Sequence, residues 1–171
     1  DFAKRESIHL TVVGPEAPLA AGIVDVFRNN GLRIFGPTQL AAQLESSKDF
    51  SKAFMKRHGI PTADYQTFSN ALEAHAYIDA KGAPIVIKAD GLAAGKGVVV
   101  TNNRDEALTH ALQSPRVVIE EYLDSPEVSL FGISDGTTVI PMQPAQDFKR
   151  AYDGDKGLNT GGMGAYSPLP W

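Results

Sequence analysis

The sequence predicts an α/β protein with more than one lobe, and three observations support this. Apolar runs at 8–13 and 32–35 flank a helical pattern at 17–30, and so short a strand–helix–strand unit implies a parallel sheet. Farther along, a glycine-rich segment at 91–97 separates two apolar, β-branched runs. The 171 residues are 43% hydrophobic and 21% charged, which is ordinary for a folded protein.

Residues 1–60 are expected to form the end of an N-terminal Rossmann-like, parallel α/β domain and a connecting helix. The run 8–13 should be a buried strand, because its apolar residues end at the turn signal Gly14-Pro15. Glycines also follow the helical pattern 17–30 and the strand 32–35, where each element should stop. A further helix is predicted over 47–58.

Residues 61–122 are expected to form a second lobe. A helix is predicted over 69–81, with Ser69 as its N-cap and Gly82 at its end. The other elements predicted in this lobe are strands at 85–88, 98–100 and 116–122 and a helix at 104–112.

Residues 123–171 are expected to begin a further lobe. Two short runs around Asp135-Gly136 predict a β-hairpin over 129–142. The segment 153–166 is expected to be a glycine-rich loop.

The glycine-rich segment carries the strongest chemical signal. Glycines let backbone N–H groups approach a phosphate chain closely, and Lys88 and Lys96 would neutralise its charge. The segment differs from a Walker A loop, because three residues rather than four separate Gly91 from Gly95 and a strand follows Gly97. It therefore predicts a flap that folds over a triphosphate; an ordinary hairpin loop is the alternative.

A second signal is the acidic end of the strand 116–122. Adjacent strand residues point to opposite faces, so one of Glu120 and Glu121 can face a cleft. A solvated strand end is the alternative interpretation.

The last third of the chain offers a third signal. Asp147, Lys149 and Arg150 precede the glycine-rich run 159–164. One carboxylate, two cations and many backbone N–H donors suit an amino-acid or phosphate substrate. A surface loop with scattered charge is the alternative.

Composition excludes several classes of function. Sixteen Lys and Arg against 20 Asp and Glu give a formal charge of −4, which argues against nucleic-acid binding. The chain has no cysteine, and its four histidines lie far apart without metal-ligand spacing. No apolar run is long enough to span a membrane. Because the chain opens on Asp1 and stops at Trp171, we expect it to be an internal excerpt of a longer enzyme.

Taken together, these motifs resemble the phosphoribosylamine–glycine ligase family (glycinamide ribonucleotide synthetases) of the ATP-grasp superfamily. The matching motifs are Gly14-Pro-Glu-Ala-Pro-Leu19, Ile34-Phe-Gly-Pro37, Ser47-Lys48, 85–98, Ile119-Glu-Glu-Tyr-Leu123 and 159–168. The resemblance implies an ATP-grasp fold, with a small lobe at 61–122 that carries the flap and the start of the large lobe at 123–171.

The implied activity is the ATP-dependent joining of glycine to 5-phosphoribosylamine, through a glycyl phosphate, in purine synthesis. The products would be glycinamide ribonucleotide, ADP and phosphate. The resemblance also implies a cytoplasmic monomer that binds small molecules and neither nucleic acid nor membrane. It implies Mg²⁺ or Mn²⁺ with ligands beyond Trp171, so the excerpt alone is expected to be inactive.

Site residues follow from the same resemblance. The residues implied for ATP are Lys48, Lys88, Gly91, Gly95, Lys96, Gly97, Glu120, Glu121, Leu123 and Glu127. Those implied for the substrates are Gly14, Pro15, Glu16, Asp147, Lys149, Arg150, Asn159, Thr160, Gly161 and Gly162. Lys88, Asp147 and Arg150 are the implied catalytic residues. Lys48 and Lys88 would contact phosphates, Glu120 and Leu123 the adenine through their backbone, and Glu127 the ribose hydroxyls.

Two other functions stay open: a sister ATP-grasp ligase with another carboxylate substrate, and a nucleotide-binding module without catalysis. One departure from the family also stands out. The segment 111–117 is shorter than the family's usual connection, through either a deletion or the omission of a loop.

Overall fold

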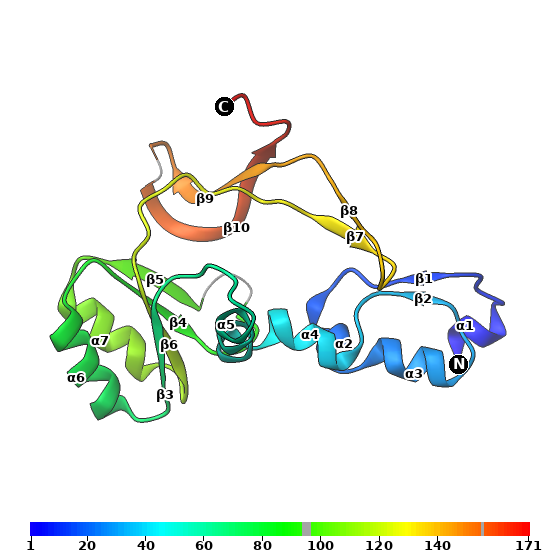
Figure 1. Ribbon diagram of the computed structural model, residues 1–171, viewed down its shortest axis with the longest axis horizontal. Coiled ribbons are helices and arrows are strands. Elements are labelled where there is room, and N and C mark those ends of the chain that lie inside the picture. The colour runs from blue at the N-terminus through cyan, green and yellow to red at the C-terminus, as the bar shows by residue number, and fades with distance from the viewer. Residues whose placement is uncertain (94–96, 155) are drawn as a thin grey trace. The chain divides into compact units, whose positions relative to one another are not determined.

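The computed structural model describes residues 1–93, 97–154 and 156–171. Its elements are traced in Figure 1. They fall into two compact units, the first over Asp1–Ala93 with Gly97–Tyr122 and the second over Leu123–Trp171. The two units are described separately.

The first unit opens with a small parallel sheet. Strand β1 (Thr11–Val12) pairs in parallel with β2 (Ile34–Phe35), which confirms the predicted parallel unit. The expectation of a buried strand at 8–13 is wrong. Val12 is 66% exposed, because a sheet of two short strands is too narrow to bury both of its faces.

The helix predicted over 17–30 is two helices, α2 (Glu16–Ala20) and α3 (Ile23–Asn29). They break at Gly22, which adopts a positive φ of 83° that a helix interior does not allow. Helices α1 (Phe2–Arg5) and α4 (Gln39–Ser46) have no counterpart in the sequence prediction.

The larger part of the first unit is a four-stranded antiparallel sheet in the order β3-β6-β4-β5. Its strands are β3 (Tyr65–Phe68), β6 (Val117–Glu121), β4 (Ile85–Ala89) and β5 (Val98–Thr101). Helices α6 (Ala71–Lys81) and α7 (Arg104–Leu112) cover one face, and α5 (Lys48–Arg57) lies on the other side (Figure 1). Apart from β3, the sequence predicts every one of these elements.

Side chains along the central strands β4 and β6 point alternately to the two faces of the sheet. Ile85 and Ile87 of β4 and Val117 and Ile119 of β6 are buried against α6 and α7. Their strand neighbours point to the opposite face, toward α5. The strand β4 therefore presents Lys88, and β6 presents Glu120, on the face away from the helical core.

The N-cap of helix α6 lies one residue later than the sequence predicts. Asn70, not Ser69, is the N-cap, and its Oδ1 accepts the backbone N–H groups of Leu72 (2.8 Å) and Glu73 (3.4 Å). Both residue types can cap a helix, so the sequence alone does not distinguish them.

We expect Asn70→Ala to lower the free energy of unfolding by about 1 kcal/mol, because two N-terminal donors of α6 lose their acceptor. Ser69→Ala is the matched control and should change it by less. Urea denaturation of both variants measures the difference. An equal loss in both variants would contradict the assignment of the cap.

The described residues of the second unit form two antiparallel strand pairs. Strands β7 (Gly132–Ser134) and β8 (Val139–Pro141) form the predicted hairpin. The predicted loop at 153–166 is wrong, because β10 (Lys156–Tyr166) pairs with β9 (Gln146–Tyr152) with two shifts of register. Glycines with positive φ let this strand bend and bulge, and they also conceal it in the sequence.

The turn of the β7–β8 hairpin depends on Asp135. Its Oδ1 accepts the backbone N–H groups of Thr138 and Thr137 and the Thr137 hydroxyl. These hydrogen bonds lower the pKa of the Asp135 carboxyl from its ordinary 3.8 to about 2. A lowered pKa means that the carboxylate stabilises the fold fully above pH 3.8, and that this contribution disappears as the pH falls through about 2.

We therefore expect the amide signals of Thr137 and Thr138 to shift with a midpoint near pH 2 in an NMR titration. Asp135→Ala should abolish this transition. A midpoint near pH 4 would be that of an ordinary aspartate and would contradict the turn contacts.

None of the helices formed by the described residues is long and apolar enough to cross a membrane.

Candidate functional site: two lysines and a glycine-rich loop

A buried carboxylate between two lysines lies at the centre of the site in the first unit. Glu120 is 4% exposed; its Oε2 is 2.8 Å from Lys52 Nζ and its Oε1 is 2.9 Å from Lys88 Nζ. Glu120 is opposite Val86 in the register of β6 and β4, and Lys88 lies two residues beyond Val86 on the same face. Strand pairing therefore brings Lys88 and Glu120 together.

The two lysines are not equivalent. Lys52 is buried, and besides Glu120 its ammonium group donates to Thr62 Oγ1 (2.8 Å) and to Ala63 O (3.3 Å). Three acceptors thus meet its three protons. The Lys88 side chain is 28% exposed, so it is less enclosed than Lys52 although Glu120 anchors its ammonium group.

Lys52 is absent from the sequence prediction. It lies four residues after Lys48 on α5, and such a spacing places both lysines on one helix face. That spacing is the signal that could have found it.

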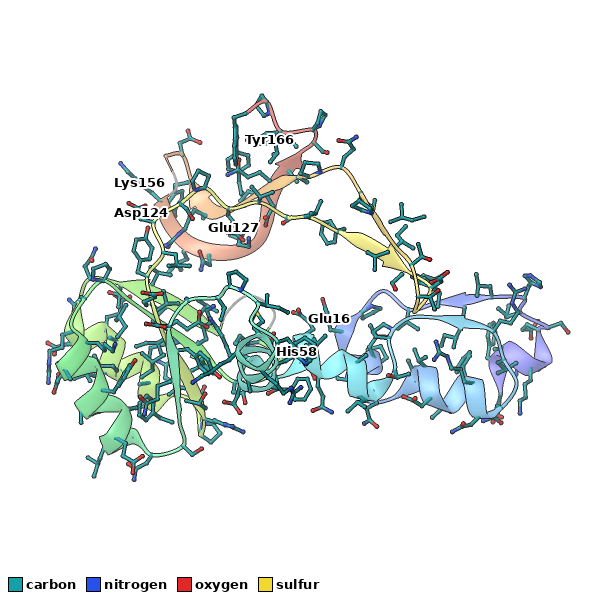
Figure 2. The ribbon with its side chains drawn as sticks, viewed as in Figure 1. Glu16, His58, Asp124, Glu127, Lys156 and Tyr166 are labelled. Carbon is teal, nitrogen blue, oxygen red and sulfur yellow. The ribbon has the colours of Figure 1, made fainter. Side chains whose placement is uncertain are left out.

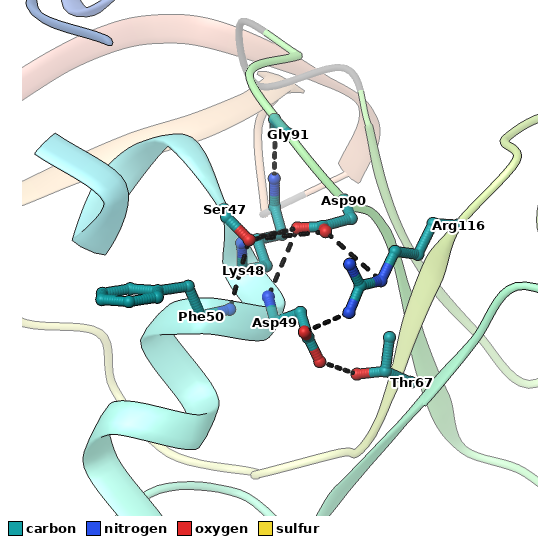
Figure 3. Close-up of polar contacts among 8 residues, drawn as sticks. All are labelled: Ser47, Lys48, Asp49, Phe50, Thr67, Asp90, Gly91 and Arg116. Atoms are coloured by element: carbon teal, nitrogen blue, oxygen red, sulfur yellow. Dashed lines mark hydrogen bonds and ion pairs between the residues drawn. The ribbon is translucent and has the colours of Figure 1, made fainter. Parts of the chain in front are cut away.

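Lys48 lies beside the start of the glycine-rich loop. Its ammonium group donates to Gly91 O (2.7 Å) from the first turn of α5, as Figure 3 shows. Gly91 has a positive φ of 105°, which favours glycine. The structure thus places Lys48 and Gly91 together, and Lys88 three residues before Gly91 on the strand that leads into the loop.

At the other end of the loop, Gly97 is packed too closely for a side chain. A Cβ atom there would lie 2.5 Å from Ala93 Cβ and 3.3 Å from Ala89 Cβ. The Gly97 carbonyl accepts the Ala89 N–H at 2.7 Å and so closes the loop onto β4. The predicted site residues Gly95 and Lys96 lie outside the described residues.

Glu121 and Leu123 follow Glu120 at the end of the first unit and the start of the second. Glu121 is exposed on the face opposite Glu120, as strand alternation predicts, and its carboxylate accepts the Asp64 N–H at 2.9 Å. Leu123 is 58% exposed.

In the second unit, three predicted site residues come together. Lys149 Nζ donates to Asp147 Oδ1 at 3.1 Å and to Glu127 Oε1, and Figure 2 shows Glu127 beside the β9–β10 pair. Desolvation opposes the charge of Lys149, but hydrogen bonds and attraction from Glu127 and Asp147 outweigh it and raise the pKa of its ammonium group. Lys149 therefore stays charged at neutral pH.

Arg150 does not join this group. It follows Lys149 on β9, where adjacent residues point to opposite faces, and its Nη1 donates to Gly157 O at 2.7 Å. Asn159 is opposite Arg150 in the register of β10. Thr160 Oγ1 donates to Lys149 O (3.0 Å) and accepts the Gly162 N–H (3.0 Å); Gly161 lies between them.

The remaining predicted residues belong to the first unit. Gly14 and Pro15 follow β1, Pro15 is the N-cap of α2 and Glu16 is its first residue. They lie at the carboxyl end of a parallel strand, where α/β proteins commonly bind ligands.

The described residues contain no group of three His, Asp or Glu side chains that could hold a metal ion.

The fold with its lysines beside a glycine-rich loop defines the ATP-grasp class. A solved biotin carboxylase from Campylobacter jejuni has the same fold, with a TM-score of 0.71 at 20% identity over 86% of this chain and 36% of that one. Models of phosphoribosylglycinamide synthetase match the chain throughout, the N domain at residues 1–45 and the ATP-grasp (A) domain at 46–171. The chain belongs to this family.

Named relatives agree with the family. A phosphoribosylamine–glycine ligase of Ralstonia nicotianae is 65% identical over 99% of this chain. The solved phosphoribosylamine–glycine ligase of Thermotoga maritima has a TM-score of 0.71 at 36% identity, over 80% of this chain and 38% of that one. The chain spans 42% of the length of the Ralstonia protein. Their alignment runs over 181 positions, so the Ralstonia protein carries residues that this chain lacks.

Proposed function

We propose that this chain supplies the ATP-binding part of a ligase that joins glycine to 5-phosphoribosylamine. The family match over the whole chain carries the proposal. The lysines at the root of the glycine-rich loop support it, because they provide the cations that a triphosphate needs. The protein would act in the cytoplasm, as a monomer, on small molecules in purine synthesis.

In this proposal, residues 61–122 form the small ATP-grasp lobe, and Lys48 and Lys88 contact the phosphates. Lys88 suits this role because Glu120 fixes its position while part of its side chain stays accessible. The backbone around Glu120 and Leu123 would hold the adenine. The carboxylate of Glu127, now paired with Lys149, would accept hydrogen bonds from the ribose hydroxyls.

The proposed reaction has two steps, and each step forms one bond and breaks another. A carboxylate oxygen of glycine attacks the γ-phosphorus of ATP, ADP leaves, and glycyl phosphate results. The amine of phosphoribosylamine then attacks the acyl carbon, loses a proton, and phosphate leaves. Both steps need neutralised phosphate charge and the exclusion of water. The two lysines would neutralise the phosphate charge, and closure of the segment 91–97 would exclude water.

Mg²⁺ would help to neutralise the phosphate charge in such a transfer, and we expect its ligands beyond Trp171. Asp147 and Lys149 would face glycine or phosphoribosylamine. Arg150 would have to exchange its contact with Gly157 for a substrate anion.

The experiment is an assay of ADP release from Mg·ATP by the complete protein that carries this sequence. Glycine is supplied with and without phosphoribosylamine, formed in the assay from ribose 5-phosphate and ammonia. Turnover that needs both substrates is the expected result. ATP binding without turnover would favour a sister ligase or a non-catalytic module, and the absence of ATP binding would overturn the phosphate flap itself.

A further inference from the structure

Asp90 lies at the junction between β4 and the glycine-rich loop, directly before Gly91. Its side chain is 11% exposed. The sequence gives no reason to single it out, yet its carboxylate contacts both the start of α5 and Arg116, the residue before β6.

On one side, Asp90 caps helix α5 from outside the helix. Its Oδ1 accepts the backbone N–H groups of Lys48 (2.8 Å) and Asp49 (3.3 Å). The Ser47 hydroxyl donates to both of its oxygens at 3.2 and 3.4 Å. Backbone donors at the start of a helix have no partner within the helix and attract negative charge. The carboxylate thus fixes the first turn of α5 against the end of β4 (Figure 3).

On the other side, Asp90 is held by Arg116, which directly precedes β6. Arg116 Nε is 3.7 Å from Asp90 Oδ2, and the Asp90 N–H donates to Arg116 O at 3.0 Å. Arg116 also pairs with Asp49, whose Oδ1 accepts the Thr67 hydroxyl of β3 at 2.6 Å. We call these residues the loop-root cluster: Ser47, Lys48, Asp49, Thr67, Asp90 and Arg116.

The cluster sets the position of Lys48 relative to the loop. The backbone of Lys48 is bound to Asp90, and its ammonium group is bound to the carbonyl of the next residue, Gly91. The Lys48 cation and the first residue of the loop therefore share one anchor. Because Lys88 lies two residues before Asp90, the same anchor fixes the spacing between the two lysines.

We propose that Asp90 is a positioning residue for ATP binding: through the start of α5 it holds Lys48 and the root of the glycine-rich loop in register. This inference rests on the proposed function only in so far as that function requires ATP.

Three variants of the complete protein test this proposal. Asp90→Ala removes the carboxylate, whereas Asp90→Asn keeps an oxygen for the N–H groups and loses the charge that faces Arg116. The matched control is Asp25→Ala, because Asp25 Oδ2 likewise accepts a helix-start N–H, that of Gln39 at 2.7 Å, away from the loop.

Calorimetry with Mg·ATP should show about tenfold weaker binding for Asp90→Ala, the equivalent of one lost charged contact. Asp90→Asn should weaken it by about two- to threefold, and Asp25→Ala should leave it unchanged. In turnover assays, the KM for ATP should rise while kcat changes little. Hydrogen exchange at the Lys48 and Asp49 amides should accelerate in Asp90→Ala.

Faster exchange with unchanged ATP affinity would overturn the positioning role, and so would equal losses in the Asp90 and Asp25 variants. If Asp90→Ala does not fold, the test rests on Asp90→Asn alone. An Mg·ATP affinity of Asp90→Asn equal to that of the unaltered protein then overturns the proposal. Should the protein bind ATP but join other substrates, the proposed ligase function fails while these affinities still decide the role of Asp90.

Discussion

Glu120→Gln should lower the free energy of unfolding of this chain by about 3–5 kcal/mol, the usual loss when a buried ion pair loses one partner. Lys52 would keep its charge in a site where it is 6% exposed. Thr62 and Ala63 would still accept two of its protons, but no carboxylate would face the third.

Urea denaturation measures the loss, and Glu121→Gln is the matched control. Glu121 is the next residue on the same strand, is exposed, and accepts one hydrogen bond from the Asp64 N–H. Its replacement should lower the free energy of unfolding by about 1 kcal/mol or less. Similar losses of unfolding free energy in the two variants would show that the buried charge of Lys52 does not need the Glu120 carboxylate.

Lys88→Met should weaken ATP binding to the complete protein by about tenfold or more, because in the proposed function it removes one cation that would contact the phosphates. The fold should suffer less than in Glu120→Gln, since Lys52 still neutralises Glu120 at 2.8 Å. Titration calorimetry measures the affinity, and urea denaturation measures the stability.

Lys81→Met is the control for the loss of a positive charge. Lys81 ends helix α6, and its ammonium group lies over the Tyr77 ring, 5.6 Å from the centroid. Its replacement should leave ATP affinity unchanged. An Mg·ATP affinity of Lys88→Met equal to that of the unaltered protein would mean that Lys88 does not contact the phosphates.

The central sheet and its helices could be predicted from the sequence because their signals are local. Strand β4 begins with the apolar run Ile85–Ile87, and α6 ends at Gly82 with a positive φ. Elements with weak local signals are not predictable in this way. Strand β3 contains Gln66 and Thr67, and β10 contains glycines throughout, so that pairing with neighbours rather than composition makes them strands.

The site divides in the same way. Lys88 and Gly91 could be predicted because a lysine beside a glycine-rich run forms a recognisable pattern, whereas Lys48 is implied only by the family resemblance. The partners of these residues could not: Asp90 is 42 residues from Lys48, and Arg116 is 67 residues from Asp49. Such contacts are set by the register of β4 and β6 and by the docking of α5, and neither leaves a mark in the local sequence.

Four residues, 113–116, connect α7 to β6, and their contacts limit where this connection can change in length. Arg116 is its last residue and also the partner of Asp49 and Asp90. Extra residues placed before Arg116 would leave that side chain at the start of β6. The same residues placed after it would carry the guanidinium away from both carboxylates. Extra residues are therefore compatible with an intact loop-root cluster if they lie before Arg116, but not if they lie after it.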